Sequence, residues 1–309
     1  KVYYGMVPDA QQQGHGFGVN FEWDIPLFEG YQWQVLANRR ASPGLDGFFR
    51  SSVRSVAAVL RRDKPDVVLL TGWQQLPLLQ ALGAAMRQRI PRIVRGESNA
   101  MKPRSWRVKL VHRVLLDCFD GYLAIGKSSR RFYLDYGIDS ARIFPCNYFV
   151  DNHRFATAAA GLANQRQGLR DKLAVPRDAV SFLYSGKLNQ KKRSTDLLAA
   201  VLAAFSSNSW IHLVVVGDGE LMDDARHFVK QHRLPVAFSG FLNQTEIVAA
   251  YVACDCLVLP SDYGETWGLV VNEAMACARP AIVSDRVGCG PDLVEDSVTG
   301  YRFPCGDVE

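Results

Sequence analysis

Two acidic residues near the carboxyl end of the chain stand where they could hold a ligand. Glu265 and Glu273 lie beyond an apolar strand expected to end at Leu259, around a helix expected to begin near Gly268. A helix N-terminus presents unpaired N–H groups and a positive dipole end, so it attracts a phosphate. The spacing does not make the two carboxylates a close pair, which suggests that they hold different parts of one ligand. Taken singly, Glu265 could simply complement the helix dipole and Glu273 could lie exposed on the helix surface.

A cluster of cations follows another expected strand. The residues after the strand over 180–184 read Ser-Gly-Lys-Leu-Asn-Gln-Lys-Lys-Arg, from Ser185 to Arg193, and a helix is expected to follow. Ligands of parallel α/β sheets bind at the carboxyl ends of the strands. Lys187 and Lys192 could therefore neutralise a diphosphate, although basic clusters are often only solvated.

Two glycine turns follow the next two expected strands. Gly217-Asp-Gly219 follows the apolar run 213–216, but Met222 occupies the last glycine position of a G-x-G-x-x-G fingerprint. Gly240-Phe241 follows the run 236–238. Alone, each turn indicates only a tight connection between a strand and a helix.

Strand-like and helix-like segments alternate over most of the chain. This alternation predicts parallel sheets with helices on both faces, and nearly continuous apolar strands agree with it. The expected strands are 67–70, 92–95, 122–125, 180–184, 213–216, 236–238, 257–259 and 281–283. The pattern breaks between residues 155 and 180, so we expect an α/β protein with domains over 1–160 and 161–309. Residues 6–50 are rich in Gly and aromatic residues and are expected to form a long functional loop region.

Composition supports two globular domains with different partners. The 309 residues are 48% hydrophobic and 22% charged, and no apolar run is long enough for a transmembrane helix. Residues 1–155 hold 22 Lys and Arg against 13 Asp and Glu, a balance of +9, whereas the remainder holds 14 against 18, a balance of −4. The seven cysteines lack metal-binding spacing, which favours reduced thiols in a cytoplasmic protein.

Taken together, the motifs resemble retaining glycosyltransferase family 4, also called glycosyltransferase group 1. Their order and spacing are similar to those of the family over roughly residues 120–309. The resemblance rests on Gly186-Lys187 with Lys192, Gly217-Asp-Gly219, Gly240-Phe241, Glu265 with Glu273, residues 256–261 and 272–276, and residues 147–151 with Phe155. The chain departs from the pattern at Lys187, where Arg is common, at Arg279, where Gly is usual, and at Asp292, where Glu is more usual.

The resemblance implies a GT-B fold, in which two Rossmann-like domains face a cleft. It implies a retaining, hexosyltransferase-type enzyme of polysaccharide biosynthesis that uses a nucleotide-diphospho sugar and a glycan or lipid-linked acceptor. The expected catalytic residues are Glu265, Lys187 and Lys192. The expected donor-binding residues are Gly186, Gly217, Gly240, Phe241, Thr266, Gly268, Leu269, Val270 and Glu273. The expected acceptor-side residues, after the strand over 92–95, are Arg95, Glu97 and Asn99.

The family's glycine-rich loop after its first strand has no counterpart, and the chain does not begin with Met. We therefore expect a trimmed fragment, with a further strand before Lys1 and closing helices after Glu309. The sequence has no D-x-D pair after a strand, so we expect neither a metal nor another cofactor, because lysines and amides can carry the charge.

The stretch Lys102–Arg113 combines basic and apolar residues. This pattern suggests peripheral contact with an anionic membrane at its cytoplasmic face, although a solvated basic face on a packed helix explains it as well. No motif supports a nucleic-acid partner.

Three alternatives to the transferase remain open at this stage. A sugar-nucleotide epimerase would share the GT-B fold and the donor site. A P-loop NTPase would use Gly121–Ser128, which matches G-x-x-x-x-G-K-S, although the residues between the glycines look like a strand. A non-catalytic protein would bind the nucleotide without turnover.

Overall fold

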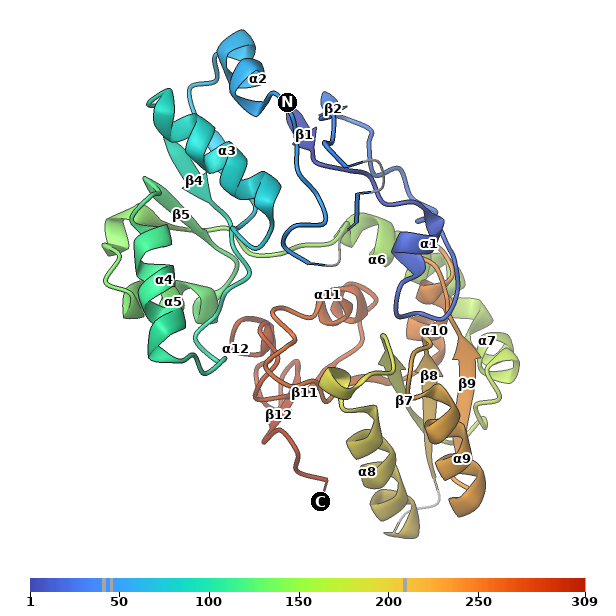
Figure 1. Cartoon of the computed structure of the whole chain (residues 1–309). Helices are drawn as coiled ribbons and strands as arrows, with labels where there is room; N and C mark the ends of the chain where they lie inside the picture. Colours follow the sequence, from blue (N-terminus) through green and yellow to red (C-terminus); the bar gives the residue numbers. More distant parts are fainter. Residues whose placement is uncertain (41–42, 45–46, 208–209, 309) are drawn as a thin grey trace. The chain divides into compact units, whose positions relative to one another are not determined.

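The computed structural model describes residues 1–40, 43–44, 47–207 and 210–308 (Figure 1). The chain divides into two compact units, each described here by itself. Unit 1 comprises Lys1–Gln13 and Pro26–Asn147, and unit 2 comprises Gly14–Ile25 and the residues from Tyr148 onward.

Unit 1 is built on a parallel sheet in the order β3-β4-β5-β6. These strands are Val68–Leu70, Arg92–Val94, Gly121–Ala124 and Ile143–Pro145. The helices are α2 Val56–Asp63, α3 Leu76–Arg87, α4 Trp106–Leu116, α5 Lys127–Asp135 and the 3-10 turn η1 Ser140–Arg142. The core around Val94, Phe119 and Tyr122 is fully buried, which explains why these short strands are apolar.

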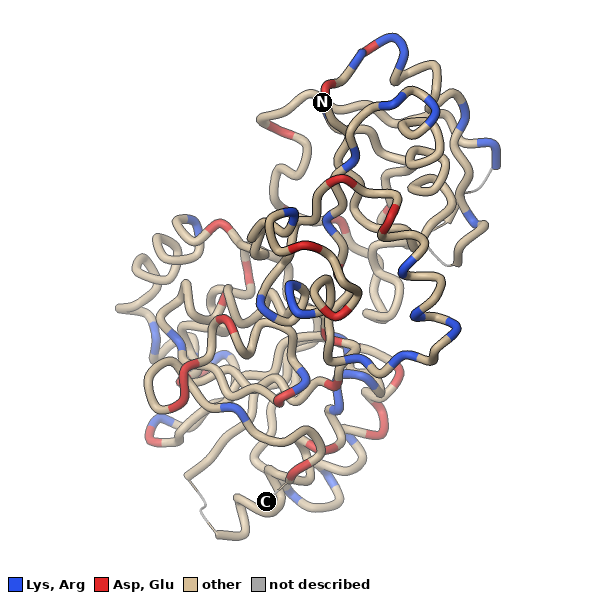
Figure 2. The backbone as a smooth tube through the Cα atoms, turned by 90° about the vertical axis from the view of Figure 1, so that its left-hand side faces the viewer, with Lys and Arg blue, Asp and Glu red and all other residues tan. Residues whose placement is uncertain are grey.

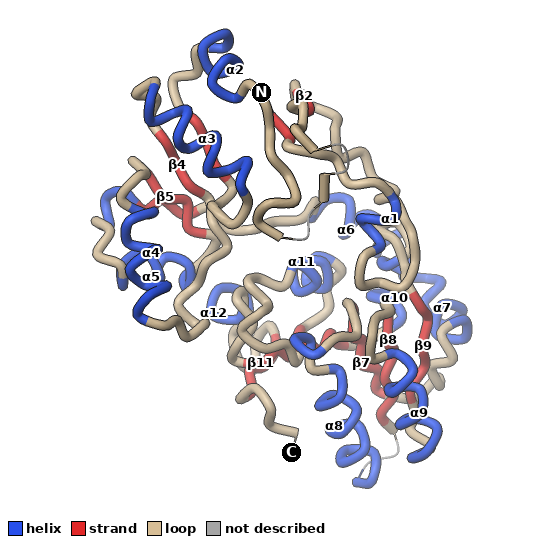
Figure 3. Tube along the Cα trace, viewed as in Figure 1, coloured by secondary structure: helices blue, strands red, loops and turns tan. Residues whose placement is uncertain are grey.

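A second, small sheet lies at the start of unit 1. Strand β1 Val2–Tyr4 pairs in parallel with β2 Trp33–Val35, and helix α1 Ala10–Gly14 lies between them in sequence. Figure 3 shows that most of the chain between β1 and α2 is loop, as expected for residues 6–50. Residues 41–42 and 45–46 of that region lie outside the described part of the chain.

Unit 2 contains a six-stranded parallel sheet in the order β12-β11-β10-β7-β8-β9. Its strands are β7 Val180–Ser185, β8 Ile211–Val216, β9 Val236–Gly240, β10 Cys256–Leu259, β11 Ala281–Ser284 and β12 Gly300–Phe303. Its helices are α6 Asn152–Leu162, α7 Arg166–Lys172, α8 Ser194–Ser207, α9 Met222–His232, α10 Ile247–Ala253, α11 Leu269–Ala276 and α12 Gly290–Leu293, with 3-10 turns η2 Ala163–Gln165 and η3 Gln190–Lys192.

The strand order of unit 2 reverses between β7 and β10. Strands β8 and β9 follow β7 outward on one side, whereas β11 and β12 follow β10 on the other side. In open α/β sheets, the loops at such a switch point diverge beyond the carboxyl ends of the strands and leave room for a ligand. A ligand site is therefore expected at the loops that follow β7 and β10.

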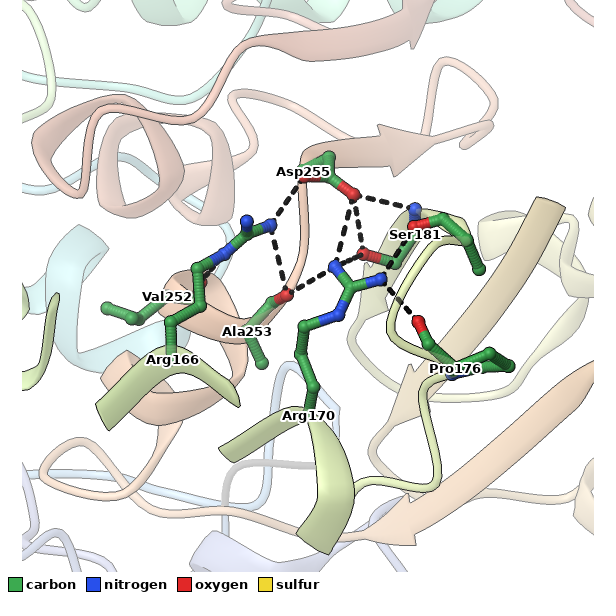
Figure 4. A network of polar contacts seen from close by, with 8 residues as sticks. Arg166, Arg170, Pro176, Ser181, Val252, Ala253 and Asp255 are labelled. Atoms are coloured by element: carbon green, nitrogen blue, oxygen red, sulfur yellow. Dashed lines mark hydrogen bonds and ion pairs between the residues drawn. The ribbon is translucent and has the colours of Figure 1, made fainter. Parts of the chain in front are cut away.

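A buried ionic network fixes the start of β7 in unit 2 (Figure 4). Arg170 is 3% exposed and donates to the carbonyls of Pro176 and Ala179 at 2.7 and 2.6 Å. The Asp255 carboxylate accepts from the Ser181 N–H at 2.8 Å and from Arg166 at 2.5 Å. Helix α7 is thereby tied to the residues that precede β7 and β10.

Every strand expected from the sequence is present. The sequence missed β1, β2, β6 and β12, which are three or four residues long and include exposed apolar side chains such as Trp33, Phe144 and Tyr301. Residues 148–160, expected in the first domain, group with unit 2, because Phe155 of α6 is buried there against the Tyr251 ring.

All seven cysteines are free, which agrees with the expected reduced thiols. Within the described residues, no helix combines the length and apolar character that a membrane span requires.

Candidate functional site

The loops after β7 and β10 meet through an ion pair between Lys192 and Glu265. The two side chains are only 13% and 15% exposed, so each charge needs its partner. The hydroxyl of the buried Ser261 lies 3.5 Å from the Glu265 carboxylate. Two residues that the sequence singled out separately are thus brought together at the switch point.

Three glycines with positive φ lie in this region. Gly186, Gly217 and Gly240 end or follow the adjacent strands β7, β8 and β9, with φ values of 152°, 124° and 75°. A Cβ on Gly217 would lie 2.0 Å from the Gly186 carbonyl oxygen. The Gly217 N–H donates to the Gly240 carbonyl at 2.8 Å. These positions require glycine because L side chains disfavour such φ values and no room exists at Gly217.

Helix α11 begins where the sequence predicts, directly after Gly268. Gly268 has a φ of 101°, and a Cβ there would lie 3.0 Å from the Leu259 side chain. The loop 287–290 fixes the residues that precede the helix. The N–H groups of Gly288 and Cys289 donate to the carbonyls of Glu265 and Trp267 at 3.0 and 2.9 Å. The helix N-terminus therefore stands on a tightly packed loop.

Three further expected residues lie at this end of α11. Leu269 and Val270 are the first two residues of the helix, where N–H groups have no partner within the helix, and Thr266 lies in the preceding loop. A Cβ on Gly288 would lie 1.8 Å from the Thr266 carbonyl oxygen, so the two loops touch. The donor-side residues predicted on the β10–α11 connection, up to Val270, thus directly follow Glu265 in the chain.

Glu273 is a buried carboxylate. It is 7% exposed and accepts hydrogen bonds from the Tyr251 hydroxyl at 2.8 Å and the Gln244 amide at 3.3 Å. Burial raises the pKa of the Glu273 carboxyl, while these two hydrogen bonds counteract part of that shift. The interpretation of Glu273 as an exposed helix residue is wrong. The face of α11 that bears Glu273 packs against Tyr251 of α10, in the interior of unit 2.

Lys187 contacts a segment that is distant in the sequence. Its ammonium donates to the His15 carbonyl at 2.5 Å and lies 4.5 Å from the centroid of the Phe17 ring. Burial lowers the pKa of Lys187, and the charges of Lys191 and Lys192 lower it further. Lys187 thus stands in a region of concentrated positive potential, as a diphosphate site requires.

The segment Gly14–Ile25 packs on the carboxyl ends of β8 and β9. The Phe241 ring lies 4.2 Å from the Phe21 ring and 5.3 Å from the Phe17 ring, measured between centroids. The Asn243 amide donates to the Glu22 carbonyl at 2.7 Å.

Asp24 secures the end of the same segment. Its carboxylate accepts from both the N–H and the hydroxyl of Thr245, the former at 3.2 Å. Sequence reasoning placed these residues in the first domain and missed their role. The available signal was the alternation of Phe and Trp with Gly over 16–23, which gives the segment a large aromatic surface to bury.

Comparison with known proteins agrees with this geometry. Residues 165–309 match the family described as glycosyl transferases group 1. The carboxy-terminal part of the chain is therefore similar to group 1 glycosyltransferases, over slightly less than half of the chain. The sulfoquinovosyl transferase of Arabidopsis thaliana is 33% identical over 130 residues, which are 41% of this chain and 24% of that protein. The chain thus spans about a quarter of the length of that relative.

Solved structures resemble most of the chain in fold. A glycosyltransferase from Rickettsia africae matches with a TM-score of 0.67 at 15% identity, over 82% of this chain and 66% of that chain. HepE of Anabaena, solved with UDP and glucose, matches with a TM-score of 0.61 at 17% identity, over 89% of this chain and 73% of that chain. The expected GT-B class, with a parallel α/β sheet in each unit, is confirmed.

The Walker-like sequence is part of the sheet of unit 1. Gly121–Ala124 is strand β5, paired on both sides with β4 and β6. A P-loop needs a flexible loop between its glycines to surround a phosphate. The P-loop alternative is therefore wrong.

The expected acceptor-side residues lie after β4 in unit 1. Asn99 is 3% exposed, and its side-chain oxygen accepts from the Met101 N–H at 3.1 Å, so it shapes the loop. Arg95 is half-buried and Glu97 is exposed on the same loop. Across the described residues, no three His, Cys, Asp or Glu side chains are grouped closely enough to hold a metal ion.

Proposed function

We propose that the whole protein transfers a sugar, as a hexosyltransferase, from a nucleotide-diphospho donor to a glycan or lipid-linked acceptor with retention of anomeric configuration. The observation that carries this proposal is the Lys192–Glu265 pair at the switch point, beside the N-terminus of α11. The match of residues 165–309 to the group 1 glycosyltransferases supports it. UDP-glucose is the first donor to test, because HepE was solved with UDP and glucose.

Charge stabilisation on the leaving diphosphate is the main catalytic contribution in this proposal. Negative charge grows on the diphosphate as the glycosidic bond breaks, and preorganised donors stabilise it. Lys187, Lys192 and the amides of Leu269 and Val270 supply those donors. The lysines and amides take the role that a metal ion has elsewhere, so the reaction needs no cofactor.

Donor binding requires an exchange of partners at both lysines. Lys192 now pairs with Glu265, and Lys187 donates to the His15 carbonyl. When the diphosphate occupies the lysines, the Glu265 carboxylate becomes available to accept hydrogen bonds from hydroxyls of the transferred sugar. The ion pair therefore holds the charged side chains of Lys192 and Glu265 in place.

The other expected residues are assigned to the nucleotide and the acceptor. Glu273 holds ribose hydroxyls, while Gly240 and Phe241 lie beside the base, with Gly186 and Gly217 allowing the donor to approach the backbone. Thr266 and Gly268 shape the loop at the diphosphate. Arg95, Glu97 and Asn99 of unit 1 face the acceptor. The enzyme acts in the cytoplasm in this proposal.

The experiment is a donor screen on the full-length protein by thermal shift with UDP-, GDP- and ADP-sugars, followed by product analysis. A shift with one class of donor and sugar transfer only in the presence of an acceptor supports the proposal. Conversion of the donor to an isomer without acceptor would show an epimerase instead, and binding without turnover would show a non-catalytic protein. The anomeric configuration of the product, read by NMR, tests retention.

A further inference from the structure

Helix α4 of unit 1 presents its apolar residues to solvent. Trp106, Leu110, Val111 and Val114 are 70%, 57%, 57% and 62% exposed, whereas Leu116 at the end of the helix is fully buried. Trp106, Leu110 and Val114 recur every four residues, so they form one stripe along the helix. A surface helix ordinarily turns such a stripe toward its own core. Here the stripe is left as an exposed apolar surface.

A wide pocket of about 810 Å³ opens beside this stripe. Its walls carry four cationic side chains, those of Lys102, Arg104, Lys109 and Arg113. Asp135 also lines the pocket, but its carboxylate is paired with Arg131 at 2.7 Å. The pocket is therefore strongly cationic, and an anion would meet little repulsion there.

One of these cations is held rigidly at the wall of the pocket. Arg104 is half-buried and donates to the carbonyls of Asn99 and Lys102 at 2.7 and 2.9 Å. Its guanidinium carbon lies 4.8 Å from the centroid of the Phe132 ring. Since its position is already determined, Arg104 loses little side-chain entropy when an anion binds.

Lys and Arg residues are not confined to the α4 surface. Figure 2 shows Lys and Arg interspersed with Asp and Glu along the backbone. What distinguishes the α4 surface is the combination of an unpaired cationic pocket with an adjoining exposed apolar stripe. A soluble anion would need the pocket alone, whereas a lipid surface needs both features.

We propose that the α4 surface docks on a membrane containing anionic phospholipids, with a headgroup phosphate in the pocket and Trp106, Leu110 and Val114 at the headgroup boundary. An exposed Trp flanked by cations is suited to that boundary. Cations near an anionic bilayer add attraction that falls off within a Debye length. The inference does not depend on the proposed transfer reaction, because a protein that only binds nucleotides would dock in the same way.

The test is co-sedimentation of the full-length protein with phosphatidylcholine vesicles, with and without phosphatidylglycerol. We expect binding only when phosphatidylglycerol is present, and weakening as salt rises. Changing Lys102, Lys109 and Arg113 to Glu should reduce the partition coefficient by at least roughly tenfold. The matched control changes three exposed arginines away from the pocket, Arg54, Arg61 and Arg87, to Glu. The control variant carries the same net charge as the pocket variant, and its partition coefficient should fall much less.

A second variant separates insertion from charge attraction. Trp106→Ser with Leu110→Ser should weaken vesicle binding while leaving its salt dependence unchanged, because the cations remain. Circular dichroism and melting of each variant show whether it is folded; both positions are exposed, so folding should be retained.

Four outcomes would overturn the proposal. The first is equal binding to both vesicle types, and the second is an equal loss in the control variant. The third is binding of inorganic phosphate by calorimetry with no vesicle binding, which would mark a site for a soluble anion. The fourth is a dimer in sedimentation velocity that the Trp106 variant dissociates, which would mark an interface between copies.

Discussion

The ammonium of Lys192 is paired with the carboxylate of Glu265, 73 residues away in the sequence. The sheet order explains this contact, since it makes β7 and β10 neighbours although η3, α8, β8, α9, β9 and α10 lie between them in the described chain. Each side chain is mostly buried, so removing either partner leaves an uncompensated charge.

The first prediction concerns the stability of this pair. Glu265→Gln should lower the free energy of unfolding by about 2–3 kcal/mol, below the range for fully buried pairs because both side chains keep some exposure. Adding Lys192→Met should restore part of the loss, since no unpaired charge then remains. Urea unfolding of the two variants measures this. Additive losses would show that the pair is not energetically coupled.

The second prediction concerns pH and Glu273. Because burial raises the pKa of Glu273 in the folded state above its ordinary value of 4.5, ionisation of Glu273 destabilises the fold as pH rises above about 4.5. Glu273→Gln removes this ionisable group. The free energy of unfolding of the variant, relative to wild type, should therefore increase as pH rises above about 4.5 and level off above the raised pKa of Glu273. Unfolding in urea at several pH values tests it.

The exposed Glu220→Gln is the control and should show no such rise. In the same Glu273 variant, donor binding should weaken if the carboxylate holds the ribose. A stability relative to wild type that stays flat or falls as pH rises would contradict the raised pKa.

The third prediction uses two glycines with positive φ. Gly217→Ala places a Cβ 2.0 Å from the Gly186 carbonyl, so it should destabilise unit 2 by about 3 kcal/mol or more, or prevent folding. Gly137→Ala meets open space and should cost only about 1 kcal/mol for its φ of 81°. Similar losses in both, measured by urea unfolding, would show that the backbone contact at Gly217 relaxes easily.

The fourth prediction concerns the segment Gly14–Ile25. A diphosphate that binds Lys187 must displace the His15 carbonyl from its ammonium. Amide hydrogen exchange over residues 14–25 should therefore change when UDP is added, while exchange in α2 should not. Unchanged protection of the segment at saturating UDP would mean that Lys187 does not receive the diphosphate.

Prediction from sequence succeeded where the physical signal is local. Strands β7, β8 and β10 are buried on both faces, so they appear as continuous apolar runs. The start of α11 follows from Gly268. The short strands β6 and β12 each carry two consecutive exposed residues and lack that signal.

The packing of Gly14–Ile25 on unit 2 has no local signal. Its aromatic residues have no helical or strand period, and their partner Phe241 lies more than two hundred positions further on. Likewise, Glu273 reads as a helix residue in the sequence, and only the position of Tyr251 shows that it faces the interior. Contacts of this kind depend on the order of strands in the sheet.

The most direct test of the donor site is calorimetric titration of UDP into the full-length protein and two lysine variants. Lys192→Gln should weaken binding by about 1.5–3 kcal/mol, roughly tenfold to a hundredfold in Kd, because a charge-assisted contact to the diphosphate is lost. Lys127→Gln, at the start of α5 in unit 1, should bind as wild type does. The reverse ranking, or equal affinity in all three proteins, would contradict a donor site at the β7–β10 switch point.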